Sequence, residues 1–488
     1  MKRLLLWVLA PLLLLAAAII INALRLEAPA TATEPMVLPA VEAAAVERLA
    51  GAIRIPTIST EVGASADTAA FARLADYLQA QFPSVHAKLQ REVIAGASLL
   101  YHWPGTDSGA APVLLLAHLD VVPVEPGTEN DWLHPPFSGA IADGHVWGRG
   151  TLDDKSSALG WMEAVEHLLA AGYIPQRSLY FAFGHDEEIG GQRGAQAMAA
   201  LLAARGVRAE FLLDEGGAIT QGVVAGLDRP VASIMVAEKG YVSFRLMATA
   251  QGGHSSMPPP QTAVGRLARA VARVQERPLP ARLTPPVAAM LEGLAPEMPL
   301  ANRVLIANRW LFEPLLLRAL ADAPVTNAMI RTTTAPTMLK AGIKDNVLPS
   351  EAQAVVNFRL LPGDRVADVE AHLREAIADD GIGIEILSGF TSEASTVSPI
   401  DTRAYRALHA TVRDVFPEAV VVPGLVTGGT DARHYDAVAQ TRYNFLPLLL
   451  QREDLARVHG SNERISVQGY LQLVQWYMRL LHNVDAMD

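Results

Sequence analysis

The chain has 488 residues, enough for two or three domains, and half of them are hydrophobic while 19% are charged, which is typical of a globular enzyme. A formal net charge of -11, without any Lys/Arg-rich run, argues against a nucleic-acid-binding protein. The chain has no cysteine, which excludes disulfides and thiolate-bound metals. Any metal would have to be held by His, Asp and Glu.

The N-terminal segment is apolar and predicts a membrane anchor. Residues 4–24 carry no charge and follow Lys2 and Arg3. At about 1.5 Å per residue they would cross most of a bilayer core of about 30 Å, and they exceed the apolar region of about 7–15 residues of a cleavable signal. The two basic residues predict a cytoplasmic N-terminus and a periplasmic or extracellular catalytic part. The alternative is a signal cleaved after Ala30-Thr31-Ala32, which would give a secreted protein.

Short apolar runs alternate with helical patterns in the first half of the chain. Residues 113–117, 178–183 and 211–213 are typical of buried parallel strands, and residues 156–171 and 194–205 of helices between them. The alternation predicts an α/β fold with a parallel sheet. Ligands bind at the carboxyl ends of such strands, where each run here is followed by acidic or imidazole side chains.

The pattern changes near residue 237 and predicts a second, smaller α+β domain. Expected strands are 241–249, 352–360 and 383–387, expected helices are 262–274, 310–321 and 365–378, and a Pro-rich stretch covers 277–299. We therefore expect an anchor or signal at 1–24, a linker at 25–42, a catalytic domain formed by 43–236 and 391–488, and an inserted domain at 237–390.

Five chemically interesting motifs, the lone His459 near the C-terminus among them, each have an ordinary structural explanation. His118 and Asp120 lie two residues apart, on one face of a strand, where a local hydrogen-bonded pair is common. Asp153 could be a helix N-cap, and His185-Asp186-Glu187-Glu188 and Asp214-Glu215 could be solvated acidic turns. So many carboxylates meeting at one sheet edge, however, would repel one another unless a cation neutralised them. A set of His, Asp and Glu suits zinc, with manganese or cobalt as alternatives.

Nine ordered stretches resemble the M20 metallopeptidases, which include glutamate carboxypeptidase, carboxypeptidase S, the aminoacylases and the N-acyl amino acid hydrolases. They are LLLAHLDVVPV (114–124), WGRGTLDDK (147–155), HDEEIGG (185–191), LLDEGG (212–217), GGHSSMPP (252–259), DNVLP (345–349), NFRLLPG (357–363), GGTDARHY (428–435) and VHGSNE (458–463). The resemblance implies a zinc-exopeptidase-like catalytic domain with a mostly parallel sheet, and a ferredoxin-like inserted domain that acts as a lid and dimerisation domain.

The resemblance also implies two zinc ions and a role for each residue around them. His118 and Asp214 would bind one metal, Glu188 and His459 the other, and Asp153 would bridge both and precede a cis peptide bond. Asp120 would orient His118, and Glu187 would be the general base that takes a proton from the attacking water.

The remaining motifs resemble the substrate-binding part of the family. His254 would stabilise the oxyanion from the partner subunit of a homodimer, and Asn346 and Arg359 would together hold a free carboxylate. Gly428, Gly429 and Thr430 would contact the substrate through their backbone.

The expected function is hydrolysis of an amide or peptide bond beside a free carboxylate, as in a carboxypeptidase acting on short peptides. The alternative is an amidohydrolase of N-acyl amino acids, fatty-acyl ones included. A third reading, a non-catalytic surface binding protein on the same fold, is disfavoured because all the expected site residues are present.

Overall fold

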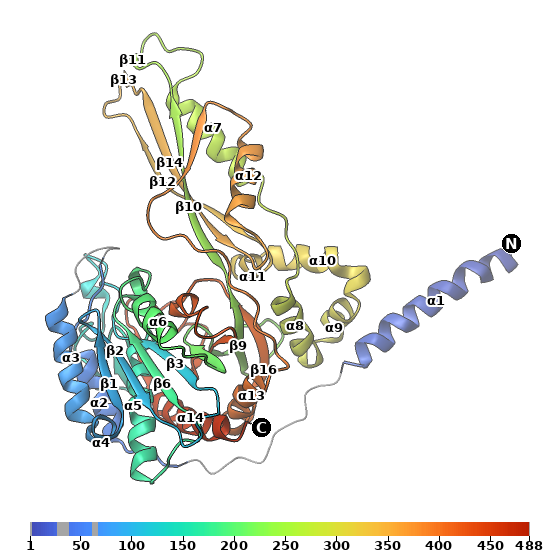
Figure 1. Ribbon diagram of the computed structural model, residues 1–488. Coiled ribbons are helices and arrows are strands. Elements are labelled where there is room, and N and C mark those ends of the chain that lie inside the picture. The colour runs from blue at the N-terminus through green and yellow to red at the C-terminus, as the bar shows by residue number, and fades with distance from the viewer. Residues whose placement is uncertain (1, 27–38, 61–66, 488) are drawn as a thin grey trace.

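Two β-sheets organise the chain, one in the main body and one in an arm that projects from it (Figure 1). The computed structural model describes residues 2–26, 39–60 and 67–487. The main sheet contains β1 (Gln90–Ile94), β2 (Ser98–Trp103), β3 (Val113–His118), β6 (Leu179–Gly184), β7 (Phe211–Asp214), β8 (Ile219–Gln221), β9 (Val231–Glu238), β16 (Val420–Val426), β17 (Arg442–Asn444) and β18 (Leu449–Gln451). Its order is β1-β2-β6-β3-β7-β17-β9-β8-β18, and β16 pairs with β9.

The central strands are parallel and buried on both faces. β3 pairs in parallel with β6 and β7, and β7 with β17. Because side chains alternate along a strand, Leu115 packs on the face covered by α5 (Lys155–Ala170) and α14 (Val467–Asp485), and Leu114 on the face covered by α6 (Ala195–Ala204). Burial on both faces explains the uninterrupted apolar runs, and the predicted mostly parallel α/β fold is confirmed.

Further helices and short strands surround this sheet. The layer that includes α5 and α14 is completed by α2 (Ala44–Ile53), α3 (Thr68–Gln81), α4 (Pro83–Lys88) and α13 (Arg403–Val415). A separate three-stranded sheet contains β4 (Ala140–Ala142), β5 (His145–Trp147) and β19 (Arg464–Ser466). Short 3-10 helices are η1 (Glu129–Asp131), η2 (Glu187–Ile189), η3 (Ala295–Glu297) and η4 (Asp431–His434).

The projecting arm is the predicted α+β insertion. Its antiparallel sheet has the order β12 (Thr333–Ala341), β14 (Glu351–Leu360), β10 (Gly240–Thr249) and β15 (Ile382–Ile386). The helices α7 (Ala263–Glu276) and α12 (Val366–Ile377) close a separate core that includes Phe244 and Phe358. The chain order strand-helix-strand-strand-helix-strand is ferredoxin-like. The ribbon β11 (Gly253–His254) and β13 (Val347–Leu348) forms the far tip of the arm (Figure 1).

Four consecutive helices within the insertion lie against the main body instead of the arm. They are α8 (Pro285–Leu294), α9 (Leu300–Ala307), α10 (Arg309–Ala321) and α11 (Pro324–Ile330). Val287 and Leu291 of α8 share a core with Leu425 of β16. The Pro-rich stretch therefore contains a helix, because Pro285 and Pro286 occupy the first turn, where a missing N–H leaves no hydrogen bond unmade.

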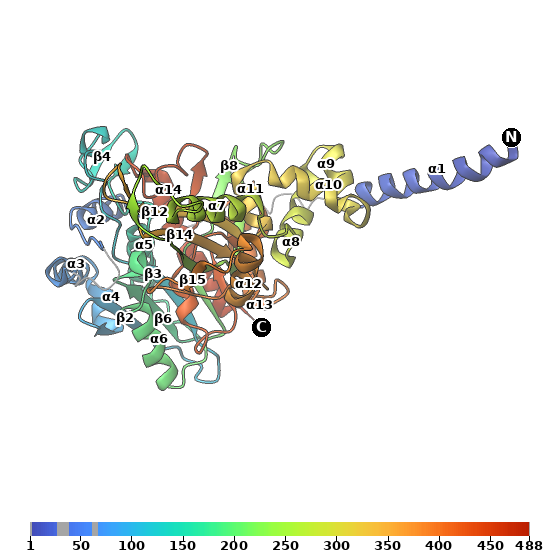
Figure 2. The same ribbon diagram turned by 90° about the horizontal axis from the view of Figure 1, so that it is seen from above.

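The N-terminal segment forms a helix that contacts the α9–α10 corner. This helix, α1 (Lys2–Leu24), projects away from the body (Figure 2). Near its end, Asn22 donates to Asn308 Oδ1, and Asn308 Nδ2 donates to the carbonyl of Ile19. Within the described ranges, no helix combines the length and the apolar character that crossing a bilayer demands, so the predicted membrane anchor is unsupported. Most of the predicted linker, residues 27–38, lies outside the described residues.

The chain passes between the two sheets at two adjacent segments. β9 of the main sheet ends at Glu238 and β10 of the arm begins at Gly240. The returning segment meets it where Tyr241 and Ser392 exchange two backbone hydrogen bonds of 2.8 and 2.9 Å. We therefore propose the division into 43–236, 237–390 and 391–488, with α8–α11 packed on the catalytic part.

Candidate metal centre

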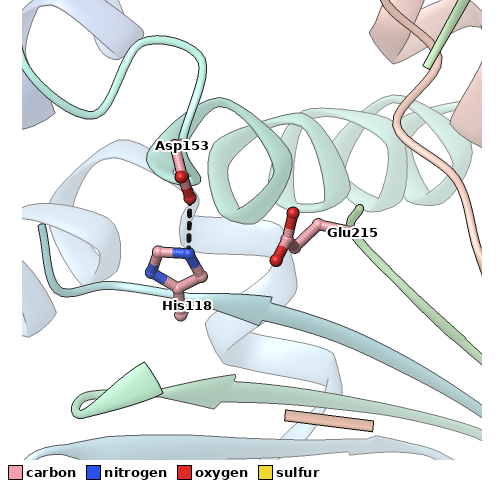
Figure 3. A group of neighbouring side chains, drawn as sticks. All are labelled: His118, Asp153 and Glu215. Atoms are coloured by element: carbon pink, nitrogen blue, oxygen red, sulfur yellow. Dashed lines mark hydrogen bonds and ion pairs between the residues drawn. The ribbon is translucent and has the colours of Figure 1, made fainter. Parts of the chain in front are cut away.

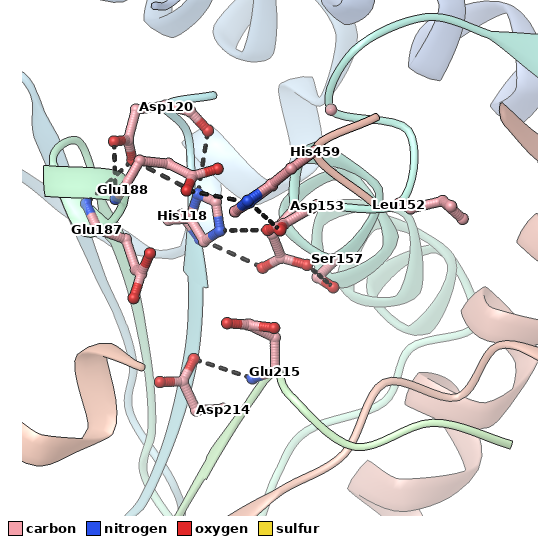
Figure 4. Close-up of polar contacts among 12 residues, drawn as sticks. His118, Asp120, Leu152, Asp153, Ser157, Glu187, Glu188, Asp214, Glu215 and His459 are labelled. Atoms are coloured by element: carbon pink, nitrogen blue, oxygen red, sulfur yellow. Dashed lines mark hydrogen bonds and ion pairs between the residues drawn. The ribbon is translucent and has the colours of Figure 1, made fainter. Parts of the chain in front are cut away.

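The ends of three neighbouring strands bring acidic and imidazole side chains together. His118 ends β3, Glu187 and Glu188 follow β6, and Asp214 ends β7. Asp153 precedes α5, and His459 comes from the distant C-terminal segment (Figure 4). The convergence expected from the sheet rule is therefore present, and it gathers residues more than 300 positions apart.

His118 is held so that one ring nitrogen faces Asp153. Its Nε2 lies 2.8 Å from Asp153 Oδ1, while its Nδ1 lies 3.0 Å from the backbone oxygen of Asp120 and 3.4 Å from Asp120 Oδ1. The Asp120 carboxylate also accepts hydrogen bonds of 3.2 Å from the backbone N–H groups of Glu187 and Glu188. Asp120 thus fixes both the imidazole and the loop that follows β6.

The carboxylate of Asp153 lies between two imidazoles, as a bridging ligand requires. Its Oδ2 is 2.9 Å from His459 Nε2, and the same nitrogen is 3.2 Å from Glu188 Oε2. Two groups of candidate ligand atoms therefore share Asp153, and within each group the atoms lie within 4.8 Å of one another. The first group is His118, Asp153 and Glu215, and the second is Asp153, Glu188 and His459.

The first group contains Glu215 instead of Asp214, the ligand that the resemblance implied. Figure 3 shows the Glu215 carboxylate facing His118 and Asp153. Asp214 instead accepts backbone hydrogen bonds from Glu215 (3.0 Å) and Ala432 (2.8 Å). The two carboxylates are adjacent in the same motif, so resemblance alone could not separate them. Strand alternation offers a signal, because neighbouring residues point to opposite sides.

The electrostatics of the site fit a bound cation. Burial, followed by the charge of Asp153, raises the pKa of Glu188, and burial raises the pKa values of Glu187 and Glu215 well above their ordinary range. Hydrogen bonds to Asp153 and Glu188 raise the pKa of His459 to about 10. Glu188 Oε1 is buried and has no hydrogen-bond partner among the described residues. Divalent cations would satisfy this oxygen and neutralise the clustered carboxylates.

A buried ion pair joins the two loops that carry Asp153 and His459. The Glu463 carboxylate accepts hydrogen bonds from Gly150 N–H (2.9 Å), Leu152 N–H (2.8 Å) and Arg149 Nη1 (2.6 Å). Arg149 Nη2 donates to the backbone oxygen of His459 at 3.0 Å. The peptide bond between Asp153 and Asp154 is cis, as the resemblance implied. Glu463 was part of a matched motif, but a sequence gives no sign of which backbone groups a carboxylate binds.

Arg359 lies near the hinge end of β14 in the arm, and Thr430 lies in the main-body loop after β16. The Arg359 guanidinium stands 4.6 Å from the centroid of the Tyr241 ring. Thr430 donates to Glu238 from its N–H (3.1 Å) and from its hydroxyl (2.7 Å), which fixes the segment Gly428–Thr430 after β16.

His254 and Asn346 lie elsewhere, at the exposed tip of the arm. Ser255 N–H donates to the backbone oxygen of Asn346, which places the two segments side by side. Between the tip and Arg359 runs β14, whose eight steps from Glu351 to Arg359 span about 26 Å at about 3.3 Å per residue. Asn346 and Arg359 of one chain therefore lie far apart, and their role in holding a free carboxylate stays a prediction.

Comparison with known proteins identifies the family. Residues 114–483, which include every member of both ligand groups, match peptidase family M20/M25/M40. The chain belongs to this peptidase family. Its members are metal-dependent, so the chain is a metal-dependent hydrolase, and the predicted family and reaction class are confirmed.

Several curated relatives cover most of the chain. The N-fatty-acyl-amino acid synthase/hydrolase PM20D1 of Xenopus tropicalis is 43% identical over 445 residues, which cover 90% of this chain and 86% of that protein. Carboxypeptidase S of Saccharomyces cerevisiae is 30% identical over an alignment of 496 positions, gaps included, that covers 92% of this chain and 85% of that protein.

Solved structures support the fold. The M20 family metallo-carboxypeptidase Sso-CP2 from Sulfolobus solfataricus superposes with a TM-score of 0.68 at 18% identity, covering 91% of this chain and 99% of that chain. Human carnosine dipeptidase 1 superposes with a TM-score of 0.62 at 16% identity, covering 91% of this chain and 96% of that chain.

Proposed function

We propose that the chain is a di-zinc hydrolase that cleaves an amide or peptide bond beside a free carboxylate. The observation that carries this proposal is the position of Asp153, whose two carboxylate oxygens face His118 and His459. His118 and Glu215 would hold one cation with Asp153, and Glu188 and His459 would hold the other. Manganese or cobalt would fit the same donors.

Glu187 is the residue best placed to move the proton. It belongs to neither ligand group, yet it follows β6, its side chain is only 11% exposed, and its carboxylate is directed into the site (Figure 4). When bound, the cations supply Lewis-acid chemistry, which makes water more acidic and polarises a carbonyl group. Glu187 takes a proton from the attacking water and passes it to the departing amide nitrogen, so the leaving group receives its proton without a second acid.

Arg359 is proposed to bind the free carboxylate of the substrate. Its side chain is half-buried, and within the described parts of the chain it forms no salt bridge with Asp or Glu. Burial lowers the pKa of Arg359 and outweighs the opposite effect of Tyr241. The carboxylate of a substrate would therefore stabilise the charged guanidinium by pairing with it.

Two substrate classes fit this site. The first is short peptides with a free C-terminus, since carboxypeptidase S is a relative. The second is N-acyl amino acids, fatty-acyl ones included, and it is favoured by relatives at 40–43% identity that are named N-fatty-acyl-amino acid synthase/hydrolases. We would measure hydrolysis of a blocked dipeptide and of a long-chain N-acyl amino acid, each with and without a chelator. Chelator-sensitive cleavage of one identifies the class, and failure on both by metal-loaded protein contradicts the proposal.

We also propose a homodimer formed through the arm. β12 is an edge strand, and apolar side chains are exposed along it and beside it, namely Met257 (79%), Met338 (65%), Leu339 (69%) and Ile343 (98%). An uncovered apolar edge of this kind favours pairing with a second copy. Such pairing would carry His254 and Asn346 toward the partner's site, since they lie away from the site of their own chain.

A further inference from the structure

The guanidinium of Arg433 contacts the proposed general base. Arg433 lies in η4, and its Nη2 is 3.2 Å from Glu187 Oε1. The side chains of Arg433 and Glu187 are only 16% and 11% exposed. Because each carboxylate oxygen has two lone pairs, Glu187 can still accept a proton while Arg433 holds Oε1.

Glu187 is also held through its backbone. Its N–H donates to Asp120 Oδ1 at 3.2 Å, and Asp120 in turn contacts His118. With the backbone fixed in this way, the freedom that remains is rotation of the Glu187 side chain. The contact with Arg433 restricts that rotation, so Asp120 and Arg433 together define where the carboxylate points.

Arg433 is itself positioned by an aromatic pair at the hinge. Its guanidinium lies 4.7 Å from the centroid of the Phe390 ring, and Phe390 contacts Tyr241 at 5.6 Å between ring centroids. The guanidinium of Arg359 lies 4.6 Å from the centroid of the Tyr241 ring. In the row Arg433–Phe390–Tyr241–Arg359 two rings thus lie between two cations, and each cation is stabilised by cation–π attraction to the ring beside it.

The two rings belong to the two segments that connect the main body with the arm. Tyr241 lies on the outgoing segment and Phe390 on the returning one, and Tyr241 is tied to Ser392 by two backbone hydrogen bonds. The proposed base and the proposed carboxylate-binding residue are therefore linked through the hinge itself. A cavity of about 460 Å³ lies beside this row and is lined by Arg433, Phe390 and Lys239 among others.

We propose that Arg433 is a positioning residue that orients Glu187 for proton transfer, and that Phe390 holds Arg433 in place. This inference rests on the proposed function, because it takes Glu187 to be the base. It differs from the role proposed for Arg359, since Arg433 acts on the reaction step and Arg359 on substrate binding. The two arginines should therefore change different kinetic constants.

The test is steady-state kinetics of metal-loaded variants on N-dodecanoyl-phenylalanine and a blocked dipeptide. R433M and R433A should lower kcat by about 100-fold or more, with KM within about threefold of wild type and both metals retained. F390L should lower kcat by about threefold to tenfold with KM unchanged. R359M should instead raise KM, and R205M, which removes an exposed arginine paired with Glu92, should match wild type.

Chemical rescue separates orientation from general structural support. The cavity beside Arg433 gives a small cation access to the space left in R433A. Millimolar methylguanidinium should raise kcat of R433A by about tenfold or more, while E187Q should not respond. A merely structural role of Arg433 predicts lower thermal stability and no rescue, and that result would overturn the inference.

The remaining outcomes are decisive as well. A kcat of R433M within about threefold of wild type, or a raised KM at unchanged kcat, overturns the role of Arg433. If R433M and R433A fail to fold or to hold metal, R433K and F390L decide, and an unchanged kcat in both contradicts the inference. An E187Q variant with wild-type kcat would refute the proposed base itself, which distinguishes failure of the proposed function from failure of the role of Arg433.

Discussion

Of the two adjacent carboxylates Asp214 and Glu215, the structure favours Glu215 as the metal ligand. Glu215 faces His118 and Asp153, whereas both oxygens of Asp214 accept backbone hydrogen bonds. We expect E215Q to lose one of two metal equivalents and to lower kcat/KM by about 100-fold or more. D214N should keep both metals. Metal content by mass spectrometry, together with kinetics, checks this, and the reverse pattern would restore Asp214 as the ligand.

Much of the site could be predicted residue by residue, and the exceptions have a physical reason. His118, Asp153, Glu188 and His459 fall where the motifs place them, because strand ends and short loops fix their positions. Glu215 and Arg433 could not be assigned, since their roles depend on side-chain direction. The distance between Asn346 and Arg359 could not be predicted, because their separation in the sequence does not reveal that a strand keeps them apart.

At the scale of elements, the Glu463–Arg149 pair connects the loop before α5 with the loop before β19. We expect E463Q to lower metal affinity by about 10- to 100-fold, because the amide binds the loop N–H groups and Arg149 less strongly than the carboxylate does. Competition with a chromogenic chelator measures the affinity. R205M, which breaks an exposed ion pair with Glu92, serves as the matched surface control and should bind metal as the wild type does. Wild-type affinity in E463Q would contradict the role of Glu463.

Lys239, between β9 and β10, predicts a pH dependence of stability. Its ammonium donates to the carbonyls of Ala328 and Arg331 at 2.9 Å, which ties the hinge to the end of α11. Burial lowers the pKa of Lys239 to about 7, below the ordinary value near 10.5. Between these values the unfolded chain binds more protons than the folded one, so the free energy of unfolding contributed by Lys239 rises with pH.

Comparison with K239M isolates this effect. Between pH 7 and 9 the free energy of unfolding of the wild type should rise relative to that of K239M by on the order of 1–2 kcal/mol. Denaturant unfolding of the metal-free proteins at several pH values measures the difference. If the difference in free energy of unfolding between wild type and K239M stays constant from pH 7 to 9, Lys239 keeps an ordinary pKa in the folded protein.

The elements themselves were largely predictable. The apolar runs became β3, β6 and β7, and the alternating segments became β10 and β14, because the period of each pattern matches one or two buried faces. The Pro-rich stretch was less informative, since proline is compatible with the first turn of a helix as well as with a loop. The packing of α8 on β16 depends on contacts between distant segments, which no local pattern reports.

At the scale of the whole molecule, the proposed dimer predicts complementation between inactive variants. H254A keeps its own metal site but lacks the histidine that it would lend to a partner, and E187A keeps His254 but lacks the base. Mixing the two after dissociation should restore part of the wild-type activity, because one site of each mixed dimer is complete. Sedimentation or light scattering should show a dimer. A monomer, or a mixture that stays inactive, would contradict the trans role of His254.

The central claim is that two cations at the Asp153 site drive hydrolysis beside a free carboxylate. The most direct measurement combines metal stoichiometry with turnover of an N-acyl amino acid and a blocked dipeptide, before chelation, after chelation and after zinc is returned. The account predicts about two equivalents of metal, loss of turnover when they are removed and recovery when zinc is restored. Turnover that survives complete removal of metal, or protein that holds two metals and cleaves neither substrate, would contradict it.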